Sequence, residues 1–200
     1  MNRLLIKGSF GPIGFGTASI SGEGGGYGFG SINEDDAISL LKYSYDRGIR
    51  LFDTAPVYGF GMAEQRLGKA FSQNRDNIFI VNKAGVTWDR NRRVNMTNDP
   101  VVTKKMLEQS LRDLNTDFID LYMIHWPDPN VDIRKSMEIL SKAKLDKKIS
   151  HIGLCNTNIS DLKLALEIDQ VEVVQSELNL FNREAINDLI PYLKEHEISF

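Results

Sequence analysis

Residues 48–71 read GIRLFDTAPVYGFGMAEQRLGKAF and contain the pattern that decides the fold. Residues 50–53, RLFD, contain two adjacent apolar residues and end in aspartate, and a glycine precedes them at residue 48. This pattern is typical of a short buried strand. A glycine-rich loop comes next, and residues 62–71 then place apolar side chains at helical spacing. A strand, a loop and an amphipathic helix in this order form the repeating unit of a parallel β/α fold.

The same unit recurs about six times along the chain, which predicts an α/β fold with a parallel sheet. The first helix is expected to begin after Asn33, whose side chain can cap it with Asp36 three residues on, and to end at Gly48. The predicted strands are residues 13–17, 50–53, 78–83, 118–125, 151–155 and 171–177. The later predicted helices are residues 62–71, 100–114, 133–144, 160–168 and 184–197.

The bulk composition is that of one globular domain. The chain has 200 residues, 42% of them hydrophobic and 26% charged, and no linker-like stretch divides it. A net charge of -3 with both signs interspersed argues against a nucleic-acid or membrane surface as a partner and favours small molecules. Cys155 is the single cysteine, so an internal disulfide is impossible, and the start of the chain lacks a signal-peptide pattern. We therefore expect a cytoplasmic protein.

Two loops depart from the strand and helix rhythm. Residues 21–31, SGEGGGYGFGS, invite a phosphate-loop interpretation, but the glycine spacing fits a dinucleotide fingerprint poorly, and a flexible loop is the favoured hypothesis. Residues 89–93, DRNRR, lie in a predicted long loop after the third strand. A solvated charged face is favoured there over an anion site.

Four polar residues are expected at the carboxyl ends of successive strands or just after them: Asp53, Tyr58, Lys83 and His125. In a parallel α/β fold these ends converge on one face, where functional sites are built. Taken singly, each residue has a plain structural explanation: a turn cap for Asp53, packing at the rim for Tyr58, a solvated Lys83 or a hydrogen-bonded core histidine.

Taken together, the four residues fit acid-base chemistry. A phenol with a pKa near 10 exchanges protons poorly at neutral pH unless its ionised form is stabilised. A buried Lys83 beside Tyr58 would lower the phenol's pKa, and Asp53 would keep the ammonium charged and in place. His125 could orient a carbonyl oxygen or relay the proton. The set suits carbonyl reduction.

At this point a family resemblance covers nearly the whole chain. The segment 48–71, with IFIVNKAG (78–85), DFIDLYMIHWPDP (117–129), HIGLCN (151–156) and VVQSELNLFNR (173–183), resembles successive signatures of the aldo-keto reductase superfamily. The resemblance implies a (β/α)8 barrel of the TIM type. It also implies that Tyr58 is the general acid, Lys83 and Asp53 its tuning pair, and His125 the residue that orients the substrate.

The resemblance further implies a nicotinamide cofactor, NADP(H) with NAD(H) as the alternative, and no metal. Family members often have serine where this chain has Cys155, which puts that contact in doubt because a thiol is a weak donor. The implied cofactor-binding residues are Gly16, Thr17, Asp53, Cys155, Asn156 and Gln175. The aromatic residues that match the substrate pocket are Trp88 and Trp126, and ordinary packing would explain them equally well.

The implied function is interconversion of aldehydes, ketones or sugars with alcohols by hydride transfer. The alternatives are a regulatory module that binds the nicotinamide cofactor and an inactive truncated relative. An eight-stranded barrel of this kind needs about 250 residues, and the pattern here supplies six β/α units and the start of a seventh. We therefore expect an incomplete barrel, from a fragment, a shortened domain or a short protein completed by another chain. Its open sheet edges would favour self-association.

Overall fold

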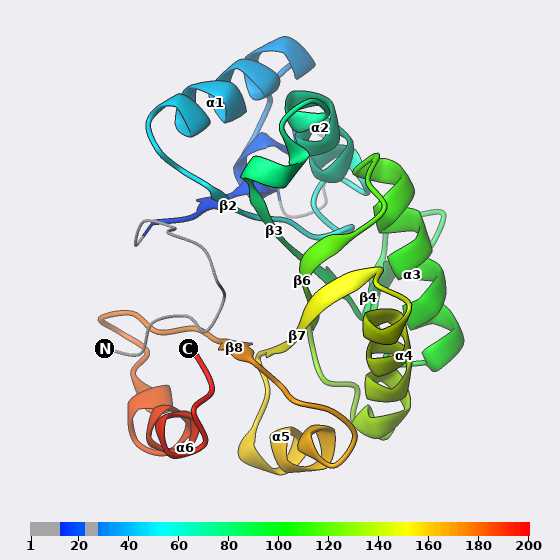
Figure 1. The fold of residues 1–200 in the computed structure, drawn as a ribbon, viewed down its shortest axis with the longest axis vertical. Helices are drawn as coiled ribbons and strands as arrows, with labels where there is room; N and C mark the ends of the chain where they lie inside the picture. Colours follow the sequence, from blue (N-terminus) through cyan, green and yellow to red (C-terminus); the bar gives the residue numbers. More distant parts are fainter. Residues whose placement is uncertain (1–12, 23–27) are drawn as a thin grey trace.

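The computed structural model describes residues 13–22 and 28–200 and contains one curled parallel sheet (Figure 1). The strand order is β1-β2-β3-β6-β7-β8, so each new strand of this sheet is added beside the previous one, and every pairing is parallel. The strands are β1 (Phe15–Gly16), β2 (Leu51–Asp53), β3 (Phe79–Ala84), β6 (Ile119–Ile124), β7 (Ile149–Cys155) and β8 (Val173–Gln175).

Helices cover the outer side of the curled sheet (Figure 1). Side-chain oxygens cap five of them, since Asn33, Asp99, Asp132, Asn158 and Asp188 each accept a hydrogen bond from a backbone N–H of the first turn. The α-helices are α1 (Glu34–Asp46), α2 (Met62–Phe71), α3 (Pro100–Asp113), α4 (Ile133–Leu145), α5 (Ile159–Leu166) and α6 (Leu189–Glu195). Short 3-10 turns are η1 (Thr17–Ile20), η2 (Arg75–Asn77) and η3 (Glu184–Ile186).

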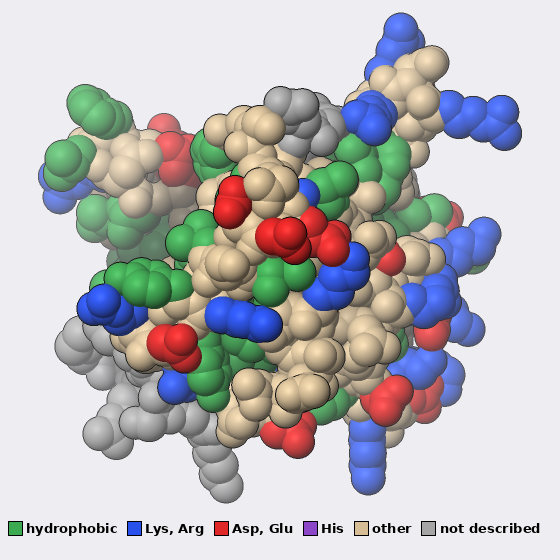
Figure 2. All heavy atoms as spheres, turned by 90° about the horizontal axis from the view of Figure 1, so that it is seen from above, with side chains coloured by type: hydrophobic (Ala, Val, Ile, Leu, Met, Phe, Trp, Pro, Cys, Tyr) green, Lys and Arg blue, Asp and Glu red, His purple; other side chains and the backbone are tan. Residues whose placement is uncertain are grey.

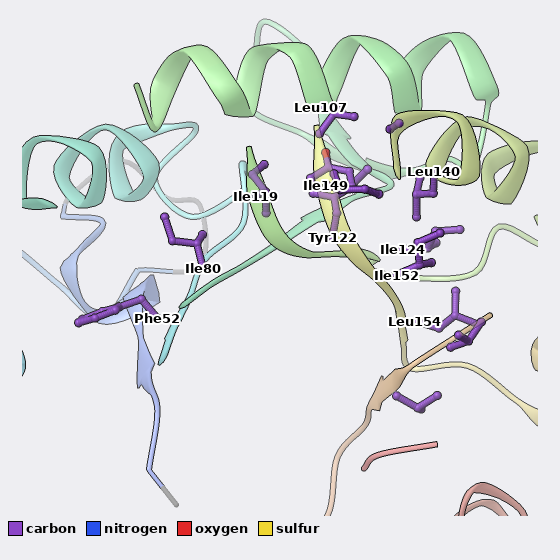
Figure 3. Packing of buried hydrophobic residues seen from close by; sticks show 14 of the residues in the cluster. Phe52, Ile80, Leu107, Ile119, Tyr122, Ile124, Leu140, Ile149, Ile152 and Leu154 are labelled. Atoms are coloured by element: carbon purple, nitrogen blue, oxygen red, sulfur yellow. The ribbon is translucent and has the colours of Figure 1, made fainter. Parts of the chain in front are cut away.

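The core lies between the sheet and the helices. In Figure 3, Leu107 of α3 and Leu140 of α4 lie on the helix side of the sheet, with Tyr122 and Ile152 of the strands in the same cluster. A smaller cluster on the inner face of the curl contains Phe79, Val81, Leu121, Met123 and Cys155. Because side chains alternate along a strand, Asn82 of β3 belongs to the helix side and Lys83 to the inner face.

The predicted fold class is confirmed: six parallel strands curl into part of a (β/α)8 barrel, and each overlaps its predicted range. The start of a seventh strand is also present. Val173 of β8 forms a parallel bridge to Ser199, whose carbonyl accepts from the Val174 N–H at 2.8 Å. One edge of β8 is therefore partly paired, which differs from the expected bare edge.

Two elements differ from the predictions. The long loop after the third strand holds an antiparallel hairpin, β4 (Val86–Trp88) with β5 (Val94–Met96). The helix predicted over residues 184–197 is split into η3 and α6. Pro191 explains the split, because its ring excludes the carbonyl of the fourth residue before it and confines proline to a helix's first turn.

The surface mixes both signs of charge. Seen from above, the molecule carries acidic and basic side chains interspersed with apolar and neutral ones (Figure 2). No helix in the described part of the chain has the length and apolar character to span a bilayer. Residues 23–27 of the predicted glycine-rich loop lie outside the described residues, so the phosphate-loop and flexible-loop hypotheses both stay predictions.

Candidate active site

The strand ends bring the predicted polar residues to one place. Asp53 ends β2 opposite Gly16 of β1, and Lys83 lies one residue before the end of β3. His125 directly follows β6, and its backbone N–H donates to the carbonyl of Ala84 at 2.8 Å. Cys155 ends β7 opposite Gln175 of β8. Asp53 pairs with Val81 and Lys83 pairs with Met123, so each candidate lies two residues further along its strand than the previous one. The parallel strands still bring the candidates together at the carboxyl edge.

Lys83 and Asp53 form the central ion pair. The Lys83 Nζ donates to Asp53 Oδ1 at 2.6 Å and to the Thr54 carbonyl at 3.1 Å, and the lysine side chain is 1% exposed. Burial alone would lower the pKa of the Lys83 ammonium, but the Asp53 carboxylate, together with Tyr58 and Cys155, holds that pKa above its usual value. Lys83 is therefore a fixed positive charge.

Tyr58 lies beside this charge in a tight turn. The Lys83 Nζ is 5.4 Å from the centroid of the Tyr58 ring. The Tyr58 N–H donates to the Ala55 carbonyl at 3.0 Å, and its carbonyl accepts from Ala63 at 3.2 Å, which fixes the turn. Gly59 follows with a φ of +66°, where an added Cβ would lie 2.6 Å from the Ser21 carbonyl oxygen, so the turn requires glycine.

The ionisation of Tyr58 differs from the sequence-based expectation. Burial raises the pKa of the phenol above its usual value, while the Lys83 ammonium acts in the opposite direction. The expected effect of Lys83 is present, but the predicted net fall of the pKa is wrong because burial is the larger contribution. Tyr58 is consequently a neutral phenol at neutral pH and carries the proton that an acid must donate.

His125 faces the same phenol. The two rings meet edge to face, with centroids 6.1 Å apart and planes at 88°. Burial, and then the nearby Lys83 charge, lower the pKa of the imidazole to about 3. His125 is thus neutral at physiological pH and can offer one ring nitrogen as a hydrogen-bond donor without adding charge.

Two amide side chains line the next strand ends. Asn156, at a left-handed φ of 51°, donates from Nδ2 to the His125 carbonyl at 3.1 Å. Gln175 donates from Nε2 to Asp53 Oδ2 at 3.3 Å and accepts from the Cys155 thiol at 3.4 Å. Burial raises the pKa of that thiol to about 12, so Cys155 acts as a neutral packing residue.

Gly16 and Thr17 leave space and, within the part of the chain that the structure describes, a free hydroxyl at the end of β1, where a cofactor could bind. A Cβ built on Gly16 would meet nothing within 4 Å, so there is open space beside Asp53. Among the described residues, the buried Thr17 hydroxyl has no hydrogen-bond partner. An open backbone, an orphan hydroxyl and two amides at neighbouring strand ends fit a flat polar group such as a nicotinamide with its ribose.

The two tryptophans predicted for the substrate pocket pack on different residues. The Trp126 ring stacks over His125 with centroids 6.5 Å apart and is 39% exposed. Trp88, at the end of β4, packs on Phe60 at 5.0 Å, and Phe60 follows Tyr58 by two residues. Trp126 therefore packs on a ring that faces Tyr58, and Trp88 packs on a neighbour of Tyr58 in the chain.

Three residues linked to Lys83 were not predicted from the sequence. Thr54 and Asn82 accept hydrogen bonds from Lys83, and Glu64 accepts one from Asn82. Asn82 left a signal, because it interrupts the apolar run of a buried strand beside Lys83. Glu64 left none, since its burial depends on how α2 packs on the sheet.

The other two histidines lie elsewhere. His151 pairs with Glu172, and His196 stacks on Tyr192 with ring centroids 4.0 Å apart. Within residues 13–22 and 28–200, no group of three or more His, Cys, Asp or Glu side chains is placed to hold a metal ion.

Comparison with known proteins gives consistent matches. The model of the aldo/keto reductase family matches residues 12–200. The aldo-keto reductase YhdN of Bacillus subtilis is 35% identical over 189 residues, which are 94% of this chain and 56% of that protein. An NADH-specific methylglyoxal reductase of Escherichia coli is 28% identical, over 93% of this chain and 60% of that protein.

Solved structures agree in fold. The structure of a glycerol dehydrogenase from Gluconobacter oxydans superposes with a TM-score of 0.89 at 32% identity, and covers 98% of this chain and 60% of that one. The chain spans between about half and three fifths of the length of the curated relatives it matches.

Proposed function

Because the chain belongs to the aldo/keto reductase family, we propose that it carries the proton-transfer residues of an oxidoreductase that interconverts carbonyl compounds and alcohols. The observation that carries the proposal is the buried ion pair of Lys83 and Asp53, 2.6 Å apart, beside the Tyr58 ring. Burying a charge costs free energy unless a partner of opposite charge offsets it, and Asp53 is that partner here. The ammonium also lies beside a phenol whose ionised form it can stabilise.

Tyr58 is the general acid of the proposed reaction. The phenol is protonated at neutral pH, and the Lys83 ammonium partly offsets the rise in pKa that burial causes. Its proton can therefore pass to the oxygen of a carbonyl as that oxygen gains negative charge. The Lys83 ammonium stabilises the phenolate that remains, and Asp53 keeps the ammonium in place through its 2.6 Å hydrogen bond.

His125 orients the substrate. A neutral imidazole can donate a hydrogen bond to the same carbonyl oxygen and fix its direction relative to the Tyr58 hydroxyl. Trp126 and Trp88 would line the two sides of the substrate pocket and exclude water from it.

A nicotinamide cofactor would be held by Asn156 and Gln175 at its amide, with Cys155 packed beneath, and by Gly16, Thr17 and Asp53 at its ribose. When bound in its reduced form, it supplies the hydride for the carbonyl carbon. We propose NADP(H) as this cofactor. The relative named as NADH-specific makes NAD(H) the alternative to be tested beside it.

The proposed substrates are small aldehydes, ketones or sugars, in the cytoplasm. Two matched proteins are named for methylglyoxal and glycerol, which are three-carbon compounds. Aromatic side chains near Tyr58, with Trp126 on His125 and Trp88 on Phe60, suit a small uncharged carbonyl compound.

The test is an assay of the purified chain with methylglyoxal or glyceraldehyde and either reduced cofactor, with identification of the alcohol product. We expect oxidation of NADPH that depends on the carbonyl compound. Binding of the cofactor without product would instead favour a regulatory module. If neither cofactor binds, the chain does not act as a reductase unaided.

A further inference from the structure

Asn82 is a buried amide with both of its polar groups engaged. It is 0% exposed on β3. Its Oδ1 accepts from the backbone N–H of Lys83 at 2.8 Å, and its Nδ2 donates to Glu64 Oε1 of α2 at 2.7 Å. The side chain thus links the backbone of the central lysine to a helix on the outer side of the sheet.

The first of these bonds replaces a regular bond of the sheet. Asp53 pairs with Val81, and the next residue, Thr54, donates its N–H to the Val81 carbonyl at 2.8 Å. In a parallel ladder the next bond would run from the Lys83 N–H to the Thr54 carbonyl. The Lys83 N–H donates to Asn82 instead, and the Thr54 carbonyl accepts from the Lys83 Nζ at 3.1 Å. The asparagine therefore frees an acceptor for the ammonium.

Glu64 determines which way the Asn82 amide faces. An asparagine can rotate its amide by half a turn and exchange its donor and acceptor. Glu64 is 1% exposed, and its Oε1 accepts from the NH₂ group of Asn82, which places that group on the helix side. The carbonyl oxygen of Asn82 must then face the Lys83 N–H.

We propose that Asn82, oriented by Glu64, is a positioning residue that keeps the Thr54 carbonyl available to the Lys83 ammonium. The inference rests on the proposed function for its purpose, since it describes how the charge beside Tyr58 is held. It does not depend on that function for its test, because the ionisation of Lys83 can be measured without a cofactor.

The test is an NMR titration of isotope-labelled lysine in the folded chain. Asn82→Leu, which is similar in volume and cannot accept a hydrogen bond, should let the Lys83 N–H take the Thr54 carbonyl. The ammonium then loses one acceptor, and the Lys83 pKa should fall by about one unit. Glu64→Gln, which keeps a carbonyl acceptor for Asn82, should leave the Lys83 pKa close to that of the wild type.

Ile80→Ala is the matched control. Ile80 lies two residues before Asn82 on the same face of β3 and is 1% exposed, so its truncation loosens the same layer without touching a polar group. It should leave the Lys83 pKa unchanged. An equal fall in Ile80→Ala, or no fall in Asn82→Leu, would overturn the inference.

A second measurement needs no variant. In the wild-type chain, the Lys83 amide nitrogen should show no coupling through a hydrogen bond to the Thr54 carbonyl carbon, and detection of that coupling would also overturn the inference. A chain that passes both measurements and reduces no carbonyl compound would refute the proposed function alone.

Discussion

At the scale of single residues, the buried Glu64 makes the stability of the fold depend on pH. The carboxyl group is almost fully buried, and burial raises its pKa from 4.5 to about 7 although the Asn82 amide partly opposes this. The folded chain therefore holds this proton between about pH 4.5 and pH 7, where the unfolded chain releases it. Stability is full below the lower value and declines as the pH rises toward the upper one.

Glu64→Gln should remove that decline. At about 1.4 kcal/mol per pKa unit, the wild type should lose about 3 kcal/mol of its free energy of unfolding between pH 4.5 and pH 8 through this group, and the variant should not. Urea titrations of both proteins at the two pH values measure the difference. A gap that does not widen with pH would mean that Glu64 ionises normally.

The same scale shows what sequence can predict about a site. Asp53, Tyr58, Lys83 and His125 could be placed because each lies at or just after the end of a recognisable strand, and parallel strands bring those ends together. Their roles remain predictions. The direction of the Tyr58 pKa could not be predicted, because it depends on how much burial opposes the Lys83 charge, and burial is a property of the folded chain.

At the scale of elements, the sequence was most informative where apolar spacing was regular. The range of α2 is the predicted one, residues 62–71, and α3 and α4 differ from their predictions by one residue at their ends. Side-chain caps explain the precise starts, since Asp99 and Asp132 immediately precede α3 and α4.

The β4–β5 hairpin was missed because its strands are short and its connection is charged. Asp89 stabilises that connection by accepting from the N–H groups of Asn91 and Arg93, at 2.7 and 2.9 Å. Such an aspartate-centred turn can be recognised in a sequence only when the flanking strands are recognised first. In the split helix, the position of Pro191 was the available signal.

At the scale of the whole molecule, one cluster of buried residues runs through the described chain. It joins Ile20 and Phe52 at one end of the sheet to Leu193 and Ile198 at the other, through Leu107 and Leu140 of the central helices (Figure 3). Continuous packing of this kind couples the stability of distant strands. We therefore propose that residues 1–200 form a single domain.

A single domain should unfold in one step. Far-ultraviolet circular dichroism and the fluorescence of Trp88 and Trp126 should give the same midpoint in urea, because both report one cooperative transition. Val174→Ala, which removes a buried side chain of β8, should move both midpoints together. Separate midpoints would show that parts of the chain unfold independently.

The central claim is that Tyr58 donates the proton in carbonyl reduction. It is tested most directly by the turnover rate of Tyr58→Phe with NADPH and methylglyoxal, with the dissociation constant of NADPH measured in the same protein. Loss of the hydroxyl should lower kcat at least about a hundredfold and leave cofactor binding nearly unchanged. Tyr45→Phe, outside the site on α1, serves as the control and should keep the wild-type rate. A Tyr58→Phe protein that turns over as fast as the wild type would contradict the account.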